Sequence, residues 1–576
     1  MLTKKTVADV IVETLKEVGI KRYYCVPGDS MNEVTTRLDD AGIQFIHTRN
    51  EGAAIFAAGA EAQLTGEITV CAGSAGPGSL HLVNGVHEAS RMNAPMLVFA
   101  THIPSTEIGG KYFQESDLKS IFKDSTCFCE MILSAEQMPR LLNIAIQTAI
   151  AKKGVAVLIF SGDVIQQVAP HQMQKQYIPK YFNPVITPSE TELNSIAKLL
   201  NDSKKIALFC GYGCKEAHDQ VVKLADKLKS PVIHALRGKE FVEYDNPYDV
   251  GMTGFLGAPS GYLAIKECDT LLLLGTGFPY RQFYPEHAKI IQIDIDGENI
   301  GRRVGVDIGA VGDIKPTIEL LLPKLQEKTE RNFLDAALKH YKKSRQNFDK
   351  LATFSTGDTT IHSQYLAKMI DNLANDDTVF SVGTGTPTAW AARYLTMNGK
   401  RRITGSFNNG SIGTAVSQAI GAQSTYPERQ VVAMCGDGGL AMFLGEFITV
   451  ENFNLPIKII IFNNHSYGFV QLEMMEAGTY SHNTDLKNPN FAKVAEAIGI
   501  KGIFINKPED IESGLKEAFA HDGPVVVDVQ VSSHELIMPP KVEIDQVKGF
   551  ALYASRVILD GDFKTLIDVA KENLFR

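Results

Sequence analysis

Short apolar runs alternate with amphipathic stretches of helical length along most of this chain, and this alternation constrains its fold more than any other feature. Runs of strand length include "KRYYCV", "ITVCAG", "PMLVFA", "TLLLLGT" and "KIIIFN". Strands that recur with a helix between them are typical of parallel sheets covered by helices. We therefore predict an α/β protein built from doubly wound parallel sheets.

Polar connections divide this pattern into three blocks. A chain of 576 residues is too long for one core, so about three domains of ordinary size are expected. The first connection is the Pro-dotted stretch "APHQMQKQYIPKYFNPVITPSE", and the second is charged and begins as a helix, "PKLQEKTERNFLDAALKHYKK". The predicted domains cover residues 1–180, 185–335 and 355–530, and a tail covers 531–576.

Composition excludes several classes of protein. A net charge of −9 and a pI near 5.9 argue against a nucleic-acid binder. No apolar run reaches the ~18 residues of a membrane span. The start, "MLTKKTVADVIVETL", lacks the apolar core and cleavage site of a signal peptide. The eight cysteines have no zinc-ligand spacing, so reduced, buried thiols of a cytoplasmic protein are expected.

Two apolar runs end in polar residues that suit a metal ion and a phosphate. "VVAMCGDGG" stops at Asp437, and "IKIIIFNN" stops at Asn464, which is 464 − 437 = 27 residues later. In open parallel sheets, ligands bind beyond the carboxyl ends of strands. A glycine-rich turn admits a phosphate, but Asp437 would repel it unless a hard cation lay between them. The sequence predicts a Mg²⁺ site made by Asp437, the amide oxygen of Asn464 and a backbone carbonyl near Ser466.

The middle block carries several glycine-rich strand ends. "CGYGC", "GMTGFLG" and "GTGFPYR" each follow a predicted strand, and "KIIQIDID" ends in acidic residues. Such ends accept the phosphates and ribose hydroxyls of a dinucleotide. The third glycine of the dinucleotide fingerprint is missing, so a standard Rossmann domain is not predicted. Several such loops in one block still indicate dinucleotide binding.

The quoted motifs together resemble one enzyme family. Gly-Asp-Gly followed by Asn-Asn is similar to the diphosphate and Mg²⁺ motif of thiamine-diphosphate enzymes. "VPGDSMNEV", "HTRNEGAAIFAAGAEAQLTGE", "CAGSAGPGSLHLVNGVHEA", "HALRGKEFVEYDNPYDVGMTGFLG" and "LLGTGFPYRQFYP" resemble the flavin-containing pyruvate oxidase group, and within it the acetate-forming pyruvate:quinone oxidoreductases. The resemblance covers essentially the whole chain.

The resemblance implies an activity and a set of cofactors and partners. The expected reaction is oxidative decarboxylation of pyruvate to acetate and CO2, with thiamine diphosphate, Mg²⁺ and FAD. Electrons would pass to a membrane quinone, ubiquinone or menaquinone. The protein would be cytoplasmic and peripherally attached to the inner face of the cell membrane, as a homo-oligomer with a tetramer expected.

The resemblance also assigns roles around the thiamine site. Glu51 holds the place of the carboxylate that protonates the aminopyrimidine. Since the family's cofactor spans two subunits, Glu51 would serve a neighbour's site. Phe113 and Gln114 would lie near the thiazolium and pyruvate. The remaining expected residues are Gly410, Ser411, Ile412, Asp437, Gly438, Gly439, Asn464, His465, Ser466, Tyr467, Gly468, Phe469, Val470 and Glu473, of which Phe469 and Glu473 share a helix face and would line the pocket between thiamine and flavin.

FAD is placed by the same resemblance in the middle block. Its expected contacts are Gly211, Gly213, Thr253, Gly254, Phe255, Leu256, Thr276, Gly277, Phe278, Pro279, Tyr280, Asp294 and Asp313.

The tail "DGDFKTLIDVAKENLFR" has an amphipathic pattern. Its apolar positions, at helical spacing, are Phe563, Leu566, Ile567, Ala570 and Leu574. Such a helix usually docks on its own protein, but a terminal one can lie in a membrane interface. Its mixed charge predicts only weak attraction to anionic lipid. The resemblance favours a phospholipid surface as its partner.

Three other functions remain open. One is a phosphate-consuming pyruvate oxidase that makes acetyl phosphate and peroxide. Another is acetolactate synthase, which carries FAD without net redox chemistry. A third is a non-catalytic cofactor-binding or membrane-associated regulatory protein, although the presence of Glu51, Asp437 and Asn464 argues against it.

Overall fold

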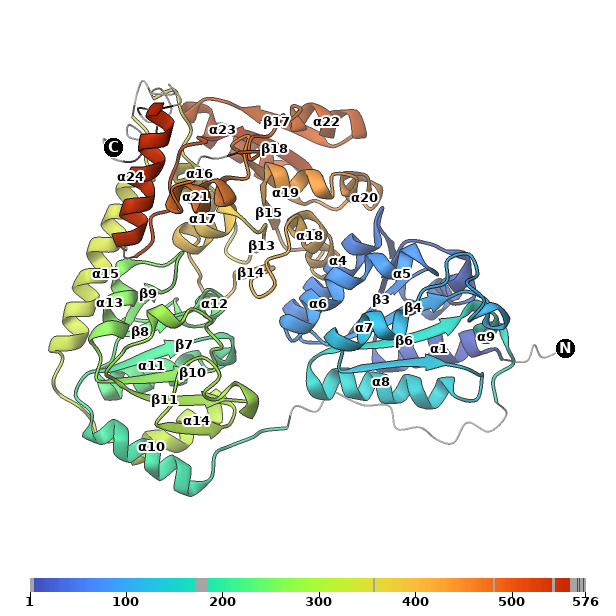
Figure 1. Ribbon diagram of the computed structural model, residues 1–576, viewed down its shortest axis with the longest axis horizontal. Helices are drawn as coiled ribbons and strands as arrows, with labels where there is room; N and C mark the ends of the chain where they lie inside the picture. Colours follow the sequence, from blue (N-terminus) through green and yellow to red (C-terminus); the bar gives the residue numbers. More distant parts are fainter. Residues whose placement is uncertain are drawn as a thin grey trace.

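Three parallel sheets of six strands, each packed against helices, make up the computed structural model (Figure 1). The structure describes residues 5–170, 184–355, 358–479, 482–540 and 544–559, together with 567, 569 and 573. The predicted α/β fold with doubly wound parallel sheets is confirmed.

The N-terminal sheet has the strand order β2-β1-β3-β4-β6-β5. Its strands are β1 Arg22–Cys25, β2 Gln44–His47, β3 Thr69–Gly73, β4 Met96–His102, β5 Phe128–Ile132 and β6 Val155–Ser161. The α-helices around it are α1 Val7–Val18, α2 Asn32–Thr35, α3 Leu38–Ala41, α4 Glu51–Thr65, α5 Pro77–His81, α6 Val83–Arg91, α7 Leu118–Phe122, α8 Met138–Lys152 and α9 Gly162–Gln166.

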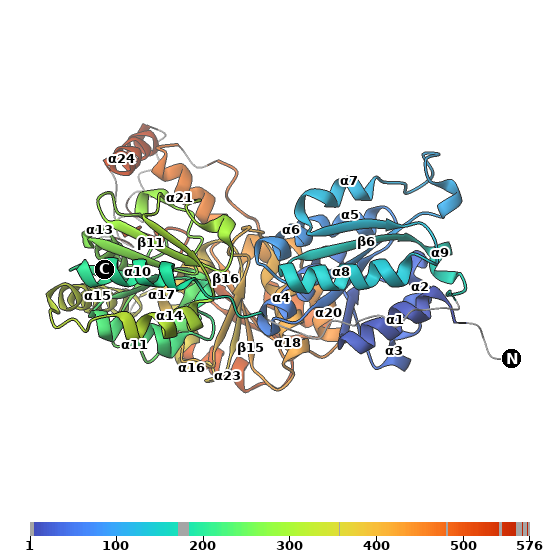
Figure 2. The ribbon, with the colours of Figure 1, turned by 90° about the horizontal axis from the view of Figure 1, so that it is seen from below.

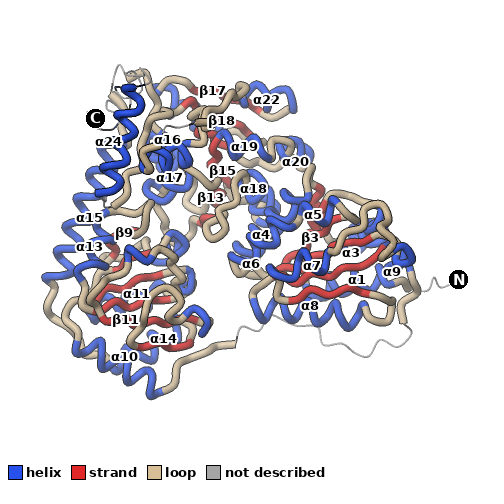
Figure 3. The backbone as a smooth tube through the Cα atoms, in the orientation of Figure 1, coloured by secondary structure: helices blue, strands red, loops and turns tan. Residues whose placement is uncertain are grey.

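The central sheet has the order β12-β11-β10-β7-β8-β9. Its strands are β7 Ile206–Cys210, β8 Val232–His234, β9 Asp249–Met252, β10 Thr270–Leu274, β11 Lys289–Asp294 and β12 Ile308–Val311. Its helices are α10 Glu190–Asp202, α11 His218–Leu228, α12 Lys239–Val242, α13 Pro259–Glu267 and α14 Ile314–Leu321. The long helix α15, Asn332–Leu351, then leads to the third sheet along one side of the molecule (Figures 1 and 3).

The C-terminal sheet has the order β14-β13-β15-β16-β18-β17. Its strands are β13 Val379–Val382, β14 Arg402–Gly405, β15 Val431–Gly436, β16 Lys458–Asn463, β17 Lys501–Ile505 and β18 Val525–Gln530. Its helices are α16 Ser363–Leu373, α17 Thr386–Tyr394, α18 Thr414–Thr425, α19 Asp437–Met442, α20 Glu446–Asn452, α21 Gly468–Glu476, α22 Phe491–Ile498, α23 Ile511–Ala520 and α24 Ile544–Leu559.

The strand order of each sheet indicates where a ligand can bind. Numbered from one within each sheet, the outer two sheets run 2-1-3-4-6-5 and the central sheet runs 3-2-1-4-5-6. The central order is that of Rossmann dinucleotide-binding folds, in which the ligand lies where the order reverses. The incomplete glycine fingerprint predicted that this would not be a standard Rossmann domain. The observed strand order shows that this prediction is wrong, because the order depends on strand pairing and not on the sequence of one turn. The reversal falls between β7 and β10 in the central sheet, and between β13 and β15 in the C-terminal sheet.

Local sequence signals account for several helix ends. Thr6 and Asp9 form a reciprocal capping box at the start of α1, and Ser189 and Glu192 form another at α10. Helix α1 ends at Gly19, whose φ of +93° suits glycine because it has no Cβ.

Helices α4 and α18 pack the N-terminal and C-terminal sheets together (Figure 2). Both helices are rich in small residues and are buried along nearly their whole length. A Cβ on Gly421 of α18 would lie 2.0 Å from the carbonyl oxygen of Ala57 on α4, so the two backbones touch closely. Arg402 on β14 joins all three parts, since it donates to Glu240 at 2.8 Å and to the carbonyl of Leu64 at 3.1 Å.

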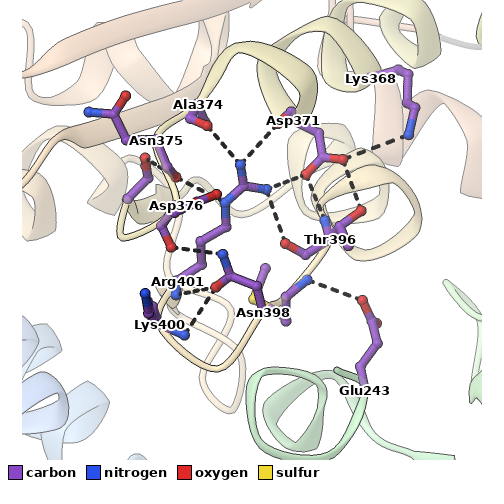
Figure 4. A network of polar contacts seen from close by, with 12 residues as sticks. Glu243, Lys368, Asp371, Ala374, Asn375, Asp376, Thr396, Asn398, Lys400 and Arg401 are labelled. Carbon is purple, nitrogen blue, oxygen red and sulfur yellow. Dashed lines mark hydrogen bonds and ion pairs between the residues drawn. The ribbon is translucent and has the colours of Figure 1, made fainter. Parts of the chain in front are cut away.

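A polar network fixes the turn between α17 and β14 and reaches the central part through Glu243 (Figure 4). The buried guanidinium of Arg401 donates to a carboxylate oxygen of Asp371 and to the carbonyl of Ala374, both at 2.8 Å. Glu243 of the central part accepts from the backbone N–H of Met397 at 3.2 Å. These contacts fix the turn between α17 and β14 against the central sheet.

The last described helix, α24, packs on α21 (Figure 2). Tyr553 and Val557 of α24 are buried against Met475 of α21. Of the predicted tail helix, Phe563, Leu566, Ala570 and Leu574 lie outside the described residues, as do residues 171–183 of the first connection. Ile567 is described and half exposed. Within the described residues, no helix combines the length and hydropathy needed to cross a bilayer.

Candidate functional site

A single cavity of about 2480 Å³ runs from the carboxyl ends of the central strands to those of the C-terminal strands. Helices α4, α6 and α8 of the N-terminal part close another side. Most of the predicted cofactor residues of the central and C-terminal parts line this cavity. Of the predicted residues, Glu51, Phe113, Gln114, Ser411 and His465 are not among those that line it.

At the C-terminal end of the cavity, Asp437 and Asn464 follow the neighbouring strands β15 and β16. Asp437 is almost fully buried, and burial raises the pKa of its carboxyl, while a hydrogen bond from Asn488 opposes that rise. Asn464 and Ser466 line the same cavity. One carboxylate, one amide and a backbone carbonyl are hard oxygen donors that suit Mg²⁺ shared with phosphate oxygens.

These donors are too few to hold a metal ion by protein ligands alone. The described part of the chain holds no group of three or more His, Cys, Asp and Glu side chains placed for a metal ion. A cation at Asp437 would therefore need oxygens from a bound phosphate as well.

Glycines allow the protein to pack closely beside Asp437. A Cβ on Gly438 would lie 2.5 Å from the ring of Tyr467, and one on Gly413 would lie 2.9 Å from the carbonyl of Gly439. Gly413 also has a φ of +88°, in the left-handed region. Larger residues at these turns would collide with the surrounding protein and displace the turn that bears Asp437.

The loop between β14 and α18 is held by the N-terminal part. Ser406 donates to the buried carboxylate of Glu88 and accepts from the backbone N–H of Ser411 at 2.7 Å. Ser411 donates to Asn84 at 3.0 Å. Ser411 thus shapes the loop from outside the cavity, whereas Gly410 and Ile412 line it.

Glu51 lies at the start of α4, and its carboxylate meets a glycine turn. Its Oε2 is 2.8 Å from Nδ1 of His81, and a Cβ on Gly78 would lie 2.9 Å from its Oε1. Gln114, with a φ of +68°, packs against Gly76 of the same turn, and Phe113 beside it is 78% exposed. These residues form a second cluster, separate from the cavity that holds Asp437.

All six strands of the central sheet end at the cavity, and their spacing spans roughly 24 Å at ~4.8 Å per strand. At the point where strand order reverses, Gly211 and Gly213 pack on Gly275: a Cβ on either would lie within 2.7 Å of the turn after β10. This edge suits an extended dinucleotide, and its glycines suit a close-lying phosphate.

Polar groups along this edge differ in how free they are to bind a ligand. The hydroxyl of Thr253 is buried and has no hydrogen-bond partner among the described residues, which suits a polar ligand. Burial raises the pKa of Asp294, which lines the cavity after β11. Asp313 lines the cavity too, but its Oδ2 accepts from the backbone N–H of Ile186 at 2.8 Å, so one oxygen already has a structural partner. Phe278 packs edge-on against Phe209 in an aromatic cluster.

Helix α21 closes the cavity between its two ends. Phe469, Val470 and Glu473 line the cavity, with Phe469 and Glu473 one helical turn apart as predicted. His465 points elsewhere, since its Nε2 is 2.6 Å from Oε1 of Gln530.

Two residues of the site were not found from the sequence. Arg237 lines the cavity after β8, with its guanidinium 4.1 Å above the ring of Tyr212 and bonded to the carbonyl of Met92 at 3.2 Å. Asn488 donates to Asp437 at 2.6 Å. Neither residue belongs to a motif with a recognisable spacing, because Arg237 stands alone in "HALRGKE" and Asn488 lies in a polar loop.

Three family descriptions match successive parts of the chain. Residues 5–121 match the thiamine pyrophosphate enzyme N-terminal TPP binding domain, residues 193–321 match the central domain, and residues 383–529 match the C-terminal TPP binding domain. Each matched range carries one of the three sheets or most of it.

Similar proteins cover from 60% to 96% of this chain. The "Uncharacterized 42.6 kDa protein in isoamylase 3'region" of Pseudomonas amyloderamosa is 53% identical over 60% of this chain and 87% of its own length. YdaP of Bacillus subtilis (strain 168), whose name describes it as thiamine pyrophosphate-containing, is 37% identical over 96% of each chain. A pyruvate oxidase of Lactiplantibacillus plantarum is 26% identical over 94% of this chain and 91% of its own.

Proposed function

Because the chain belongs to the thiamine pyrophosphate enzyme family, with all three of its domains, we propose that it oxidatively decarboxylates pyruvate to acetate and CO2. The proposed cofactors are thiamine diphosphate, Mg²⁺ and FAD, and the proposed electron acceptor is a membrane quinone. The observation that carries the proposal is the single cavity that joins the dinucleotide edge of the central sheet to Asp437 and Asn464. One cavity allows electrons to pass between two cofactors without leaving the protein.

The described residues fit these groups. Thiamine diphosphate would supply an electron sink for the loss of CO2, and FAD would accept two electrons. Asp437, Asn464 and the carbonyl of Ser466 would hold Mg²⁺ against a diphosphate at the glycine turn after β15. The unpartnered hydroxyl of Thr253 and the Gly211–Gly213 turn would receive FAD.

Glu51 is proposed to exchange a proton at Oε1, the oxygen beside Gly78. His81 holds the other oxygen, so the carboxylate has a fixed orientation. Since Glu51 does not line the cavity of its own chain, the proposal completes each site with a second copy of the protein. A homo-oligomer, with a tetramer expected, follows from this arrangement.

Residues of α21 are proposed to exclude water and line the substrate space. Phe469 and Val470 are apolar, and Glu473 faces the same cavity one turn later. Phe113 and Gln114 of the second copy would approach from the other side. The similarity to a protein named pyruvate oxidase supports pyruvate as the substrate.

The proposed domains of the chain are residues 1–180, 185–335 and 355–530, followed by a tail over 531–576. The tail would attach the protein to phospholipid on the cytoplasmic face of the membrane, where a quinone is available. Both the tail's role and the quinone rest on the motif resemblance.

Pyruvate-dependent reduction of a soluble quinone is the test. Purified protein would receive thiamine diphosphate, Mg²⁺ and FAD without phosphate, with and without lipid vesicles. The proposal expects quinone reduction and acetate formation, both increased by lipid. Peroxide and acetyl phosphate, formed only when phosphate and O2 are supplied, would instead identify a phosphate-dependent oxidase. Acetolactate formed without any acceptor would identify an acetolactate synthase.

A further inference from the structure

We propose that Asn488 is a positioning residue for the metal site, because it sets which oxygen of Asp437 faces the cavity. The inference rests on the proposed function, since it concerns the Mg²⁺ site assigned there. Asn488 lies in the loop between α21 and α22, 51 residues after Asp437 in sequence. It is not itself proposed as a metal ligand.

One amide group joins the two strand ends of the site. The Nδ2 of Asn488 donates to Oδ2 of Asp437 at 2.6 Å and to Oδ1 of Asn463 at 2.9 Å. Asp437 follows β15, and Asn463 is the last residue of β16, directly before Asn464. The amide therefore bridges the strand that bears the carboxylate ligand and the strand that leads to the amide ligand.

This bridge leaves Asp437 one oxygen for a cation. With Oδ2 occupied by Asn488, the carboxylate can offer Oδ1 to an ion in the cavity. Groups that orient metal ligands in this way keep the ligand from rotating and affect metal affinity by about 10–100-fold. Without the bridge, the buried carboxylate would also lose one of its hydrogen-bond donors, which is unfavourable.

The bridge is itself anchored in the C-terminal sheet. Asn463 is fully buried, and its Nδ2 donates to Oδ1 of Asp528 on β18 at 2.9 Å. The other oxygen of Asp528 accepts from the backbone N–H of Phe491 at 2.9 Å. Phe491 comes three residues after Asn488, so the loop is tied to the sheet at two points.

A neighbouring residue provides a matched control. Asn490, two positions along the loop, caps α22 by accepting from the backbone N–H of Lys493 at 2.9 Å. Replacing a capping Asn by Ala typically costs about 0.5–2 kcal/mol of stability. Asn490→Ala therefore perturbs the same loop without touching Asp437.

Mn²⁺ binding to the full-length protein tests the inference. Mn²⁺ would be titrated in the presence of thiamine diphosphate and followed by electron paramagnetic resonance. Asn488→Leu, which keeps the size but removes the donor, should weaken Mn²⁺ binding about 10–100-fold. At saturating Mn²⁺ the same variant should bind thiamine diphosphate as the wild type does. Asn490→Ala should bind Mn²⁺ with unchanged affinity although it melts at a lower temperature.

The outcomes separate this inference from the proposed function. A folded Asn488→Leu protein with wild-type Mn²⁺ affinity would overturn the role of Asn488, as would an equal loss in Asn490→Ala. If Asn488→Leu does not fold, Asn488→Ala is judged by the same criteria. A wild-type protein that binds neither Mn²⁺ nor thiamine diphosphate would overturn the proposed cofactor site itself.

Discussion

Glu51 is the residue on which the proposed proton transfer depends. Glu51→Gln keeps the size and the contact with His81 but removes the exchangeable carboxylate. Turnover should fall about 10²–10⁴-fold, as for other general acid–base groups. Flavin absorbance of the purified protein should not change, because the residues proposed to hold FAD all lie in the central part and do not include Glu51.

The control for this variant is Glu17→Gln, at an exposed position of α1. It should keep full activity. Full activity in Glu51→Gln as well would remove Glu51 from the proposed chemistry.

Arg237 is expected to contribute to flavin binding. Its guanidinium lines the cavity between Tyr212 and Met92, and a charge-assisted hydrogen bond to an anionic ligand is worth about 1.5–3 kcal/mol. Arg237→Gln should weaken FAD binding about 10–100-fold, measured by quenching of flavin fluorescence on titration of the apoprotein. Lys289→Gln, at an exposed position on β11, should leave FAD affinity unchanged. Equal FAD affinity in wild type and Arg237→Gln would contradict the expectation.

Secondary-structure elements show why some strands were predicted and others were missed. Strands with continuous apolar runs, such as β3, β4 and β10, were predicted from sequence. Strands β5 and β12, which were not predicted, both lie at sheet edges. In the C-terminal sheet β13, β14, β17 and β18 were not predicted either, and of these β14 and β17 are edge strands. An edge strand has one strand neighbour, so its apolar run can be interrupted, as by Glu130 in β5.

Two central strands carry buried ionisable groups whose pKa values move in opposite directions. Burial raises the pKa of Asp249 on β9 to about 8, with a further contribution from Glu243. Burial lowers the pKa of His234 on β8 to about 4. Lys239 of α12 and Tyr341 of α15 also face Asp249.

These shifts predict how stability depends on pH. Between about pH 4 and 8, the folded state keeps Asp249 protonated while the unfolded state releases that proton, so stability falls as pH rises. His234 has the opposite effect between about pH 4 and 6.5, because the unfolded state is the one that binds the extra proton there. The net fall should therefore be clearest from pH 6.5 to 8, at no more than about 1.4 kcal/mol per pH unit.

Thermal unfolding across that range tests the assignment. The melting temperature of the wild type should decline from pH 6.5 to 8, and Asp249→Asn should flatten the decline, because an amide does not titrate. A decline of the same size in both proteins would mean that another group is responsible.

For the whole molecule, the contact between α4 and α18 is the main link between the N-terminal and C-terminal parts. A Cβ on Gly421 would lie 2.0 Å from the carbonyl oxygen of Ala57, and backbone cannot move away as a flexible side chain can. Gly421→Ala should destabilise the protein by about 1–3 kcal/mol, as overpacking usually does. Gly305→Ala, where a Cβ would meet no described atom within 4 Å, is the control for denaturant unfolding. Equal stability of the two variants would show that the helices can separate at little cost.

The sequence by itself determined the α/β class, the three-block organisation and the placing of Asp437 and Asn464 at neighbouring strand ends. These features are local: an apolar run followed by a glycine or polar turn marks a strand end wherever the strand lies in space. Helix α21 with Phe469 and Glu473 one turn apart is local in the same sense.

Only the tertiary structure decided which distant segments meet. The contact of Asn488 with Asp437 spans 51 residues, that of Arg237 with Met92 spans 145, and that of Arg402 with Leu64 spans 338. The separation of Glu51 from the cavity of its own chain likewise follows from how α4 packs on α18. Apolar periodicity specifies that a face must be buried, but not which other face will cover it, because the hydrophobic effect is non-directional.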